Sequence, residues 1–181
     1  MMATTRARAL DAAIELLGTG GLRALSHARV DERAGLAKGS TSNHFRTRAA
    51  LLAGVADRMA ELELAAFNRP VAPASADELV EILAGMLEFV TGANRTLTTA
   101  RLVLFMEASH DEALRTAVSR GHGAMRSWLV PMLAGVGARE PWAAADLVIA
   151  CCEGLILHRV ARGDPTDARP TLRRVVRAAL T

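Results

Sequence analysis

A run of hydrogen-bonding side chains near the N-terminus is the feature of this 181-residue chain that points most directly to a chemistry. The run covers residues 38–44 and follows Gly35, which can take a left-handed conformation and end a helix. A short helix with such side chains can donate to and accept from base edges in the major groove of DNA. We expect the exposed positions of this helix to carry Lys38, Ser40, Thr41, Ser42, Asn43 and His44.

Within this run, four side chains are candidates for base contacts. Asn43 can present a donor and an acceptor together to adenine. His44 has the equal alternative of packing against the neighbours of Phe45, and Gly39 is expected to let the backbone approach DNA closely. The base-contact candidates are Ser40, Ser42, Asn43 and His44.

Further residues around the two short helices are candidates for phosphate contacts. A cation or hydroxyl in the first turn of a helix adds to the free backbone amides there, which attract anions. The alternatives are a solvated charge or a structural cap, and for a hydroxyl the cap and the contact are compatible. Arg29 can reach a phosphate or a guanine, or else form an ion pair with Asp31 or Glu32. His27 is included in the candidate site because histidine is unusual at its position. The phosphate candidates are Ser26, Lys38, Thr47 and Arg48.

Hydrophobic periodicity predicts the helices that hold these side chains. A helix over Thr5–Leu17 is expected to stop at the glycines of Gly18–Gly21. The first short helix covers Ser26–Ala34 and is begun by its serine as N-cap. The second covers Lys38–Phe45, and a longer helix with a threonine cap is expected over Arg48–Asn68.

The charge distribution agrees with a nucleic-acid surface. Residues 1–50 hold eight basic and four acidic side chains, a net +4, although the whole chain carries only +3. A localised basic excess is typical of phosphate binding. Lys38 is the single lysine of the chain, and its compact charge suits a phosphate at the start of the second short helix.

The composition predicts an all-α, cytoplasmic protein. The chain is 51% hydrophobic, lacks tyrosine, and shows no alternating runs of β-branched residues. No apolar stretch reaches the roughly 18 residues of a membrane span, and the N-terminus lacks the hydrophobic region of a secretion signal. The adjacent Cys151 and Cys152 form no disulfide framework, and we interpret them as buried core rather than a redox switch.

No catalytic centre, metal site or cofactor is expected. The five histidines are scattered without metal-ligand spacing, and neither a glycine-rich phosphate loop nor a nucleophile elbow is present. An enzyme is therefore the weakest of the function classes.

The sequence predicts two domains, the second of which consists of longer helices. We place a helix-turn-helix domain at residues 1–50 and a helical domain at residues 51–181, with Pro70–Ser75 as the clearest break in composition. A helix over Pro141–Arg162 is apolar on nearly all faces and should be buried on all of them. With the amphipathic segment Thr171–Leu180 it is our candidate for the surface that joins two subunits. The helices expected between these segments are Ala76–Thr91, Thr96–Ser109 and Asp111–Ala134.

These residues resemble the TetR family of bacterial transcriptional repressors. Specific motifs carry the resemblance over about Ala9–Val55, and the remainder resembles the family only in its helical layout. The family pattern has an alanine-rich first helix, a glycine loop, a serine or threonine opening the second helix, E-R-A-G, K-G-[ST], an aromatic residue, and [ST]-[KR]-x-x-L-L. Here these are Ala12/Ala13, Gly20/Gly21, Ser26, Glu32–Gly35, Lys38–Ser40, Phe45, and Thr47–Arg48 with Leu51–Leu52.

The chain departs from this pattern at the third helix. The family usually has a branched apolar residue followed by tyrosine, where this chain has Thr41 and Ser42. The customary serine or threonine cap is Ala37, a loss that we expect to weaken a short helix by about 1 kcal/mol. His27 replaces an apolar residue of the second helix. The base preference of relatives should therefore not be transferred to this chain.

The resemblance implies a homodimeric regulator that binds double-stranded operator DNA, most simply a repressor released by a small, apolar effector. Two-fold symmetry makes the expected operator palindromic. The alternative is a ligand- or protein-binding dimer whose helix-turn-helix no longer reads a specific operator. The resemblance also implies a ligand site in the second domain, although methionine and phenylalanine at helical spacing are more often plain core. The candidate wall residues are Met86, Phe89, Phe105, Met106, Met125 and Trp128.

Overall fold

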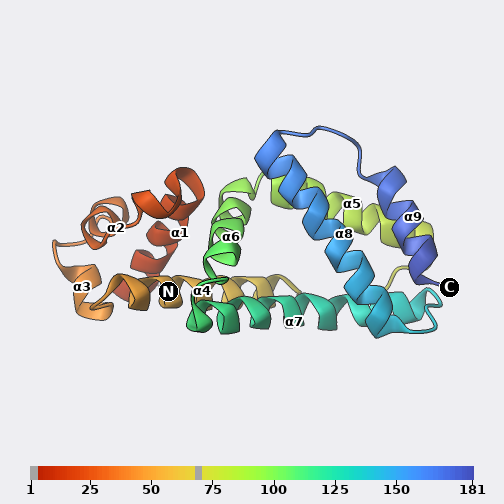
Figure 1. Cartoon of the computed structure of the whole chain (residues 1–181), viewed down its shortest axis with the longest axis horizontal. Coiled ribbons are helices and arrows are strands. Elements are labelled where there is room, and N and C mark those ends of the chain that lie inside the picture. Colours follow the sequence, from red (N-terminus) through yellow and green to blue (C-terminus); the bar gives the residue numbers. More distant parts are fainter. Residues whose placement is uncertain (1–3, 68–70) are drawn as a thin grey trace. The chain divides into compact units, whose positions relative to one another are not determined.

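The computed structural model describes residues 4–67 and 71–181, and over this range the predicted all-α class is confirmed. Within these ranges, no helix has the length and apolar character needed to cross a membrane. The helices, labelled in Figure 1, are α1 Thr5–Ala24, α2 His27–Ala34, α3 Ser40–His44, α4 Arg48–Phe67, α5 Ala76–Thr91, α6 Arg95–Glu107, α7 Glu112–Gly135, α8 Pro141–Arg162 and α9 Arg169–Ala179.

Two helices of the second half have the bounds that the sequence predicted, α5 and α8. The hydroxyl of Ser75 accepts from the amide of Glu78 at 3.1 Å and begins α5. Pro141 occupies the first turn of α8, and Gly163 ends that helix in a left-handed conformation with φ 66°. Local caps and breakers thus fix both segments.

The predicted end of α1 is wrong. The helix continues through Gly18 to Ala24, and only Gly21, with φ 63° and ψ −167°, leaves the helical region. A Cβ atom added at Gly18 would lie 2.1 Å from the carbonyl oxygen of Thr96. Gly18 therefore permits close packing between α1 and the start of α6 instead of ending a helix.

The chain divides into two compact units, residues 1–63 with 96–121 and residues 64–95 with 122–181. The first unit therefore contains more than the head predicted at residues 1–50, because α6 and the beginning of α7 belong to it. In the first unit, α1, α2 and α3 pack together (Figure 1). Its core includes Leu10, Leu17, Leu25, Val30, Phe45, Leu51, Val55, Leu104 and Leu114.

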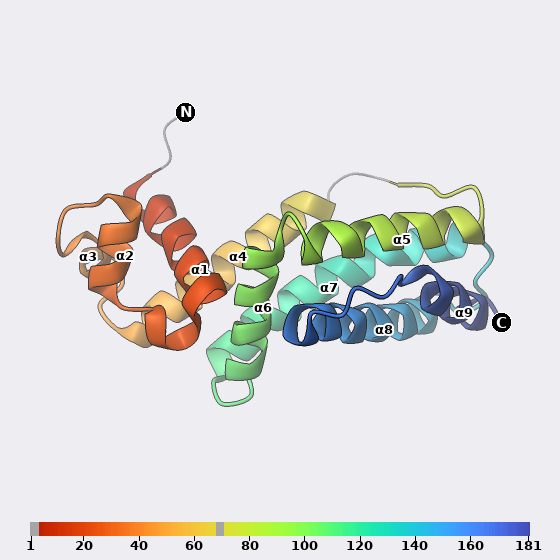
Figure 2. The ribbon, with the colours of Figure 1, turned by 90° about the horizontal axis from the view of Figure 1, so that it is seen from above.

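In the second unit, α5, α8 and α9 lie side by side (Figure 2). The expectation that α8 is buried on all faces is wrong for the single chain. One side of α8 contributes Val148, Ile149 and Ile156 to the core, whereas Leu147 and Leu157 are 45% and 47% exposed. An apolar strip of α8 thus remains open to solvent.

Candidate nucleic-acid interface

The segment from α2 to α3 is built on two glycines in left-handed conformations. The hydroxyl of Ser26 accepts from the amide of Arg29 at 3.3 Å and begins α2 as predicted. Gly35, with φ 61°, ends α2, and Gly39, with φ 89°, precedes α3. Since Lys38 and Gly39 lie in the turn, α3 is shorter than the predicted Lys38–Phe45.

A buried carboxylate takes the place of the missing serine or threonine cap. One oxygen of Asp31 accepts from the amide of Gly39 at 2.8 Å. The other accepts from the amide of Thr41 at 2.8 Å and from its hydroxyl at 2.5 Å. Thr41 is fully buried and Asp31 is 4% exposed, so the expectation that Thr41 is exposed is wrong. Asp31 supplies from α2 the cap that Ala37 cannot, and α3 keeps its N-terminal hydrogen bonds.

The Asp31 carboxylate is held in its ionised form. Burial opposes ionisation. The hydrogen bonds from Thr41 and from the amide of Gly39, together with the nearby His27, outweigh burial and lower the pKa of Asp31 below its ordinary value of 3.8.

His27 ties the other end of α3. Its Nε2 atom lies 2.6 Å from the carbonyl oxygen of Phe45, the residue that ends the helix. Because a carbonyl only accepts, Nε2 carries the hydrogen in this contact. The imidazole, placed among the DNA-contact candidates, is thus engaged within the protein.

Two arginines near the N-terminus likewise donate to main-chain carbonyl oxygens. Arg48 donates to Leu25 at 3.0 Å and to Leu22 at 2.6 Å. Arg8 donates to Ala34 at 2.6 Å, near the end of α2. A carbonyl at a helix end has no partner inside its helix, and these guanidinium groups satisfy it. The structure therefore gives Arg48, a phosphate candidate, a contact that holds the fold.

The remaining candidates are open to solvent. Ser42, Asn43 and His44 are exposed, and in the described part of the chain their side chains make no hydrogen bond. Ser40, by contrast, donates its hydroxyl to the carbonyl of Ala37 at 2.6 Å. The base-contact candidates thus reduce to three adjacent side chains on α3.

The two phosphate candidates with hydroxyls are exposed caps. Thr47 accepts from the amide of Ala50 at 3.0 Å, as Ser26 does from Arg29. Each hydroxyl keeps its hydrogen for an outside acceptor. Arg29 and Lys38 are exposed and form no ion pair within residues 4–67 and 71–181. The carboxylate of Asp31, one of the partners considered for Arg29, is directed to α3.

Sequence reasoning missed Arg46. It is exposed between α3 and the threonine cap of α4, and among the described residues it has no ion-pair partner. The available signal was a cation between an aromatic residue that ends one helix and the cap that begins the next. Arg6 is a second cation of this region and lies over the ring of Phe45, 5.4 Å from its centroid.

The candidate ligand-wall residues are not gathered into one described cavity. Phe105 and Met106 belong to the first unit and the other four to the second. Phe89, Phe105 and Met106 are 57%, 51% and 69% exposed, which does not fit the enclosed wall that was expected of them. The half-buried members are Met86, Met125 and Trp128.

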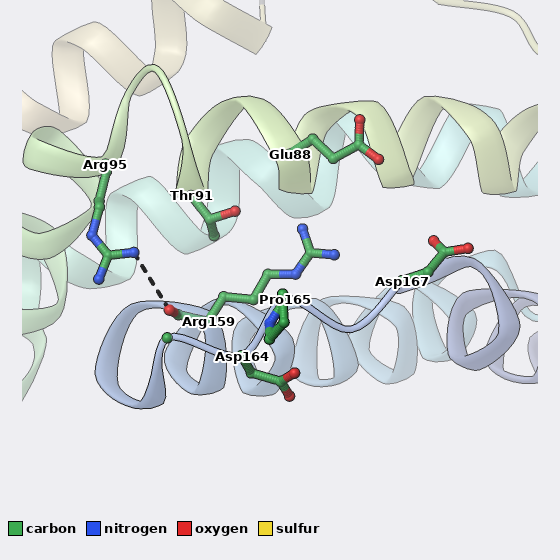
Figure 3. A pocket seen from close by; sticks show the side chains of 8 residues that line it. Glu88, Thr91, Arg95, Arg159, Asp164, Pro165 and Asp167 are labelled. Atoms are coloured by element: carbon green, nitrogen blue, oxygen red, sulfur yellow. Dashed lines mark hydrogen bonds between the residues drawn. The ribbon is translucent and has the colours of Figure 1, made fainter.

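The cavity in Figure 3 belongs to the second unit and is lined by polar groups. It has a volume of about 320 Å³. Arg95 donates to the main-chain carbonyls of Arg159 at 3.4 Å and Val160 at 2.8 Å. The lining is charged, unlike the apolar site that the sequence led us to expect, and comprises Glu88, Thr91, Arg95, Arg159, Gly163, Asp164, Pro165 and Asp167.

Neither cysteine has a disulfide partner, and Cys152 is buried as expected. Burial raises the pKa of Cys152 to about 12. Over the described residues, no cluster of histidine, cysteine and acidic side chains could hold a metal ion.

The helix-turn-helix arrangement and the helical second unit define a class, and comparison with known families gives it a name. A model of the tetR family of bacterial regulatory proteins matches residues 9–55. A model of the tetracyclin repressor-like C-terminal domain matches residues 74–181. The chain belongs to the TetR family of transcriptional regulators, and the family predicted from the sequence is confirmed.

Solved structures resemble the chain over nearly its whole length. SCO7518 of Streptomyces coelicolor A3(2), a candidate transcriptional regulator, is 26% identical, with 99% of this chain and 100% of that chain covered and a TM-score of 0.79. SCO1917 of Streptomyces coelicolor A3, a TetR-family member, is 25% identical, with 99% of each chain covered and a TM-score of 0.74.

The multidrug binding protein EbrR, in complex with ethidium, is also 25% identical, with 98% of this chain and 99% of that chain covered and a TM-score of 0.76. A search of curated proteins found no match.

Proposed function

We propose that this TetR-family protein is a cytoplasmic, homodimeric repressor that binds a palindromic operator through α3 and is released by a small molecule. The observation that carries the proposal is the exposure of Ser42, Asn43 and His44, three adjacent side chains on a helix whose ends are both tied to α2. Such a helix presents its hydrogen-bonding groups in one orientation, as base reading requires.

The cations around α3 supply the phosphate contacts of the proposal. Arg29, Lys38 and Arg46 are exposed, and the caps Ser26 and Thr47 present hydroxyls beside the free amides of two helices. If each subunit neutralises three or four phosphates, the logarithm of the binding constant falls with the logarithm of salt at a slope of about −5 to −7 for the dimer.

The proposed dimer forms through α8 and α9. Trp142, Leu147 and Leu157 of α8 are half exposed in the single chain, and burial of such apolar side chains drives association. A two-fold dimer places the two α3 helices in symmetry-related grooves, and the operator is then palindromic.

A small, apolar effector is the third part of the proposal. It is supported by the similarity to EbrR, which was solved with ethidium. Met86, Met125 and Trp128 are the half-buried side chains of the second unit from which we would begin to map the effector site.

The test is selection of a duplex from a random-sequence pool by the purified protein, followed by titration at two salt concentrations. We expect a palindromic consensus, and Asn43→Ala should weaken binding to the selected duplex at least tenfold while the protein stays dimeric. Arg139→Ala is the control, because it removes an exposed arginine from the turn between α7 and α8. A pool that yields no consensus would favour the alternative, a helical dimer that does not read an operator.

A further inference from the structure

The two ends of α3 are held by two side chains of one helix. His27 and Asp31 are both on α2 and are separated by about one helical turn, so that they share a face. Asp31 receives the amides of Gly39 and Thr41 at the beginning of α3, and His27 donates to the carbonyl of Phe45 at its end. We propose that His27 and Asp31 act as a clamp that sets the orientation in which α3 reads DNA.

The clamp is needed because α3 cannot hold itself. It spans Ser40–His44, and a helix this short is not stable alone in water, because it forms few hydrogen bonds for the residues that it orders. Its orientation must therefore be imposed by its neighbours.

Apolar packing alone leaves part of that orientation open. The hydrophobic effect is non-directional, whereas a hydrogen bond is strong only over a narrow range of angles. The Asp31 carboxylate binds the hydroxyl and the amide of Thr41 with the same oxygen, and Thr41 is fully buried. This contact fixes the rotation of α3 about its own axis.

The side chains proposed to read bases follow the clamped residue directly. Ser42, Asn43 and His44 lie between Thr41 and Phe45, the two residues that the clamp holds at opposite ends. A rotation of α3 at Thr41 would move all three together. His27 and Asp31 are thus positioning residues that touch no base, and this role depends on the proposed DNA binding.

The test compares specific with nonspecific binding. Thr41→Val removes the hydroxyl with little change in volume, and His27→Leu removes the donor to Phe45. For each variant, affinity is measured for the duplex that the wild-type protein selects and for a scrambled duplex of equal length. We expect at least a tenfold loss for the selected duplex and less than a twofold change for the scrambled one, because phosphate attraction does not require the fixed orientation.

A conservative variant and a packing variant control for simple loss of folding. Thr41→Ser retains the hydroxyl and should restore the affinity for the selected duplex. Val30→Ala removes buried volume from α2 without touching the clamp, and it should lower the melting temperature while preserving the ratio of the two affinities. Amide exchange at Gly39 and Thr41 should accelerate in Asp31→Asn, a readout that requires no DNA.

The outcomes separate the clamp from the proposed function. If the wild-type protein selects a duplex but Thr41→Val and His27→Leu keep its affinity ratio, the clamp has no part in reading and the inference is wrong. If the wild-type protein selects no duplex, the proposed function fails, and any role of the clamp in reading fails with it.

Discussion

In the first unit, α2 and α3 are held by side chains that bond to the backbone of another element, in addition to ion pairs such as that of Arg58 with Asp11. In the second unit, pairs of charged side chains connect α9 to α5. Arg48 donates to the carbonyls of Leu22 and Leu25. Arg169, in contrast, pairs with the carboxylates of Glu81 and Glu88, each at 2.9 Å.

The difference concerns which conditions disturb each unit. A main-chain carbonyl carries no net charge and does not titrate, so its hydrogen bonds respond little to salt. Exposed ion pairs are screened by salt and contribute little in water. The packing of α1, α2 and α3 should therefore be sensitive to changes of shape, and the Arg169 contacts of α9 should be sensitive to changes of ionic conditions.

The strongest test of this contrast replaces one glycine in each unit with alanine. Gly18→Ala would place a Cβ atom 2.1 Å from the Thr96 carbonyl oxygen, and we expect the free energy of unfolding to fall by about 2–3 kcal/mol. Gly85 of α5 has open space around it, so Gly85→Ala should be neutral or stabilise by up to about 1 kcal/mol. Urea unfolding measures both, and equal effects would remove the contrast.

Two neighbouring arginines separate structural from DNA-binding roles. Arg48→Ala removes the guanidinium donor from the carbonyl of Leu25 and one of two donors from the carbonyl of Leu22, which still accepts from the Leu25 amide. Stability should fall by about 1–2 kcal/mol. Arg46→Ala should leave the melting temperature unchanged and reduce the magnitude of the salt slope of DNA binding by about one for each phosphate that is no longer neutralised. Thermal unfolding and salt titrations check the pair. A stable Arg48→Ala would show that its two hydrogen bonds are dispensable.

The ion pairs of α9 should give a smaller and salt-dependent effect. Arg169→Ala removes the pairs with Glu81, Glu88 and Asp167 and should lower the melting temperature in dilute buffer. In 1 M salt the difference from the wild-type protein should shrink, because the Debye length falls to about 3 Å. Arg174→Ala, an exposed change on the same helix, is the control. If Arg169→Ala is equally destabilising in high salt, Arg169 stabilises α9 through packing rather than through its ion pairs.

The smallest expected effect is a dependence on pH. The pKa of Asp31 is lowered, so its stabilising contribution is complete above the ordinary value of 3.8 and is lost as the pH falls through the lower value in the folded protein. Unfolding measured from pH 6 to pH 3 should depend less on pH in Asp31→Asn. Glu32→Gln, an exposed change beside it, should behave as the wild-type protein does.

Features set by neighbouring residues could be predicted from the sequence. The cap at Ser26, the left-handed Gly35, and the bounds of α5 and α8 depend on residues within one turn, where capping and helix-breaking rules apply. The family could also be predicted, because its motifs occupy one continuous segment.

Features set by distant residues could not be predicted. The Arg48 hydrogen bonds join positions 23 and 26 residues apart, and Gly18 is explained only by Thr96. Thr41 was expected to be exposed because so short a segment does not reveal which face is buried. An acceptor for α3 could have been sought once Ala37 was seen to lack a capping side chain, and Asp31 and Glu32 were then the two nearest carboxylates on the preceding helix.

The clamp on α3 also separates the residues that hold the helix from those that face outward. His27, Asp31 and Thr41 point into the protein, and Ser42 and Asn43 point away from it. Outward positions can therefore be exchanged without disturbing the hydrogen bonds that place the helix. Within residues 27–45, engineering or natural mutation can therefore change the side chains that face outward while the hydrogen bonds that hold α3 are retained.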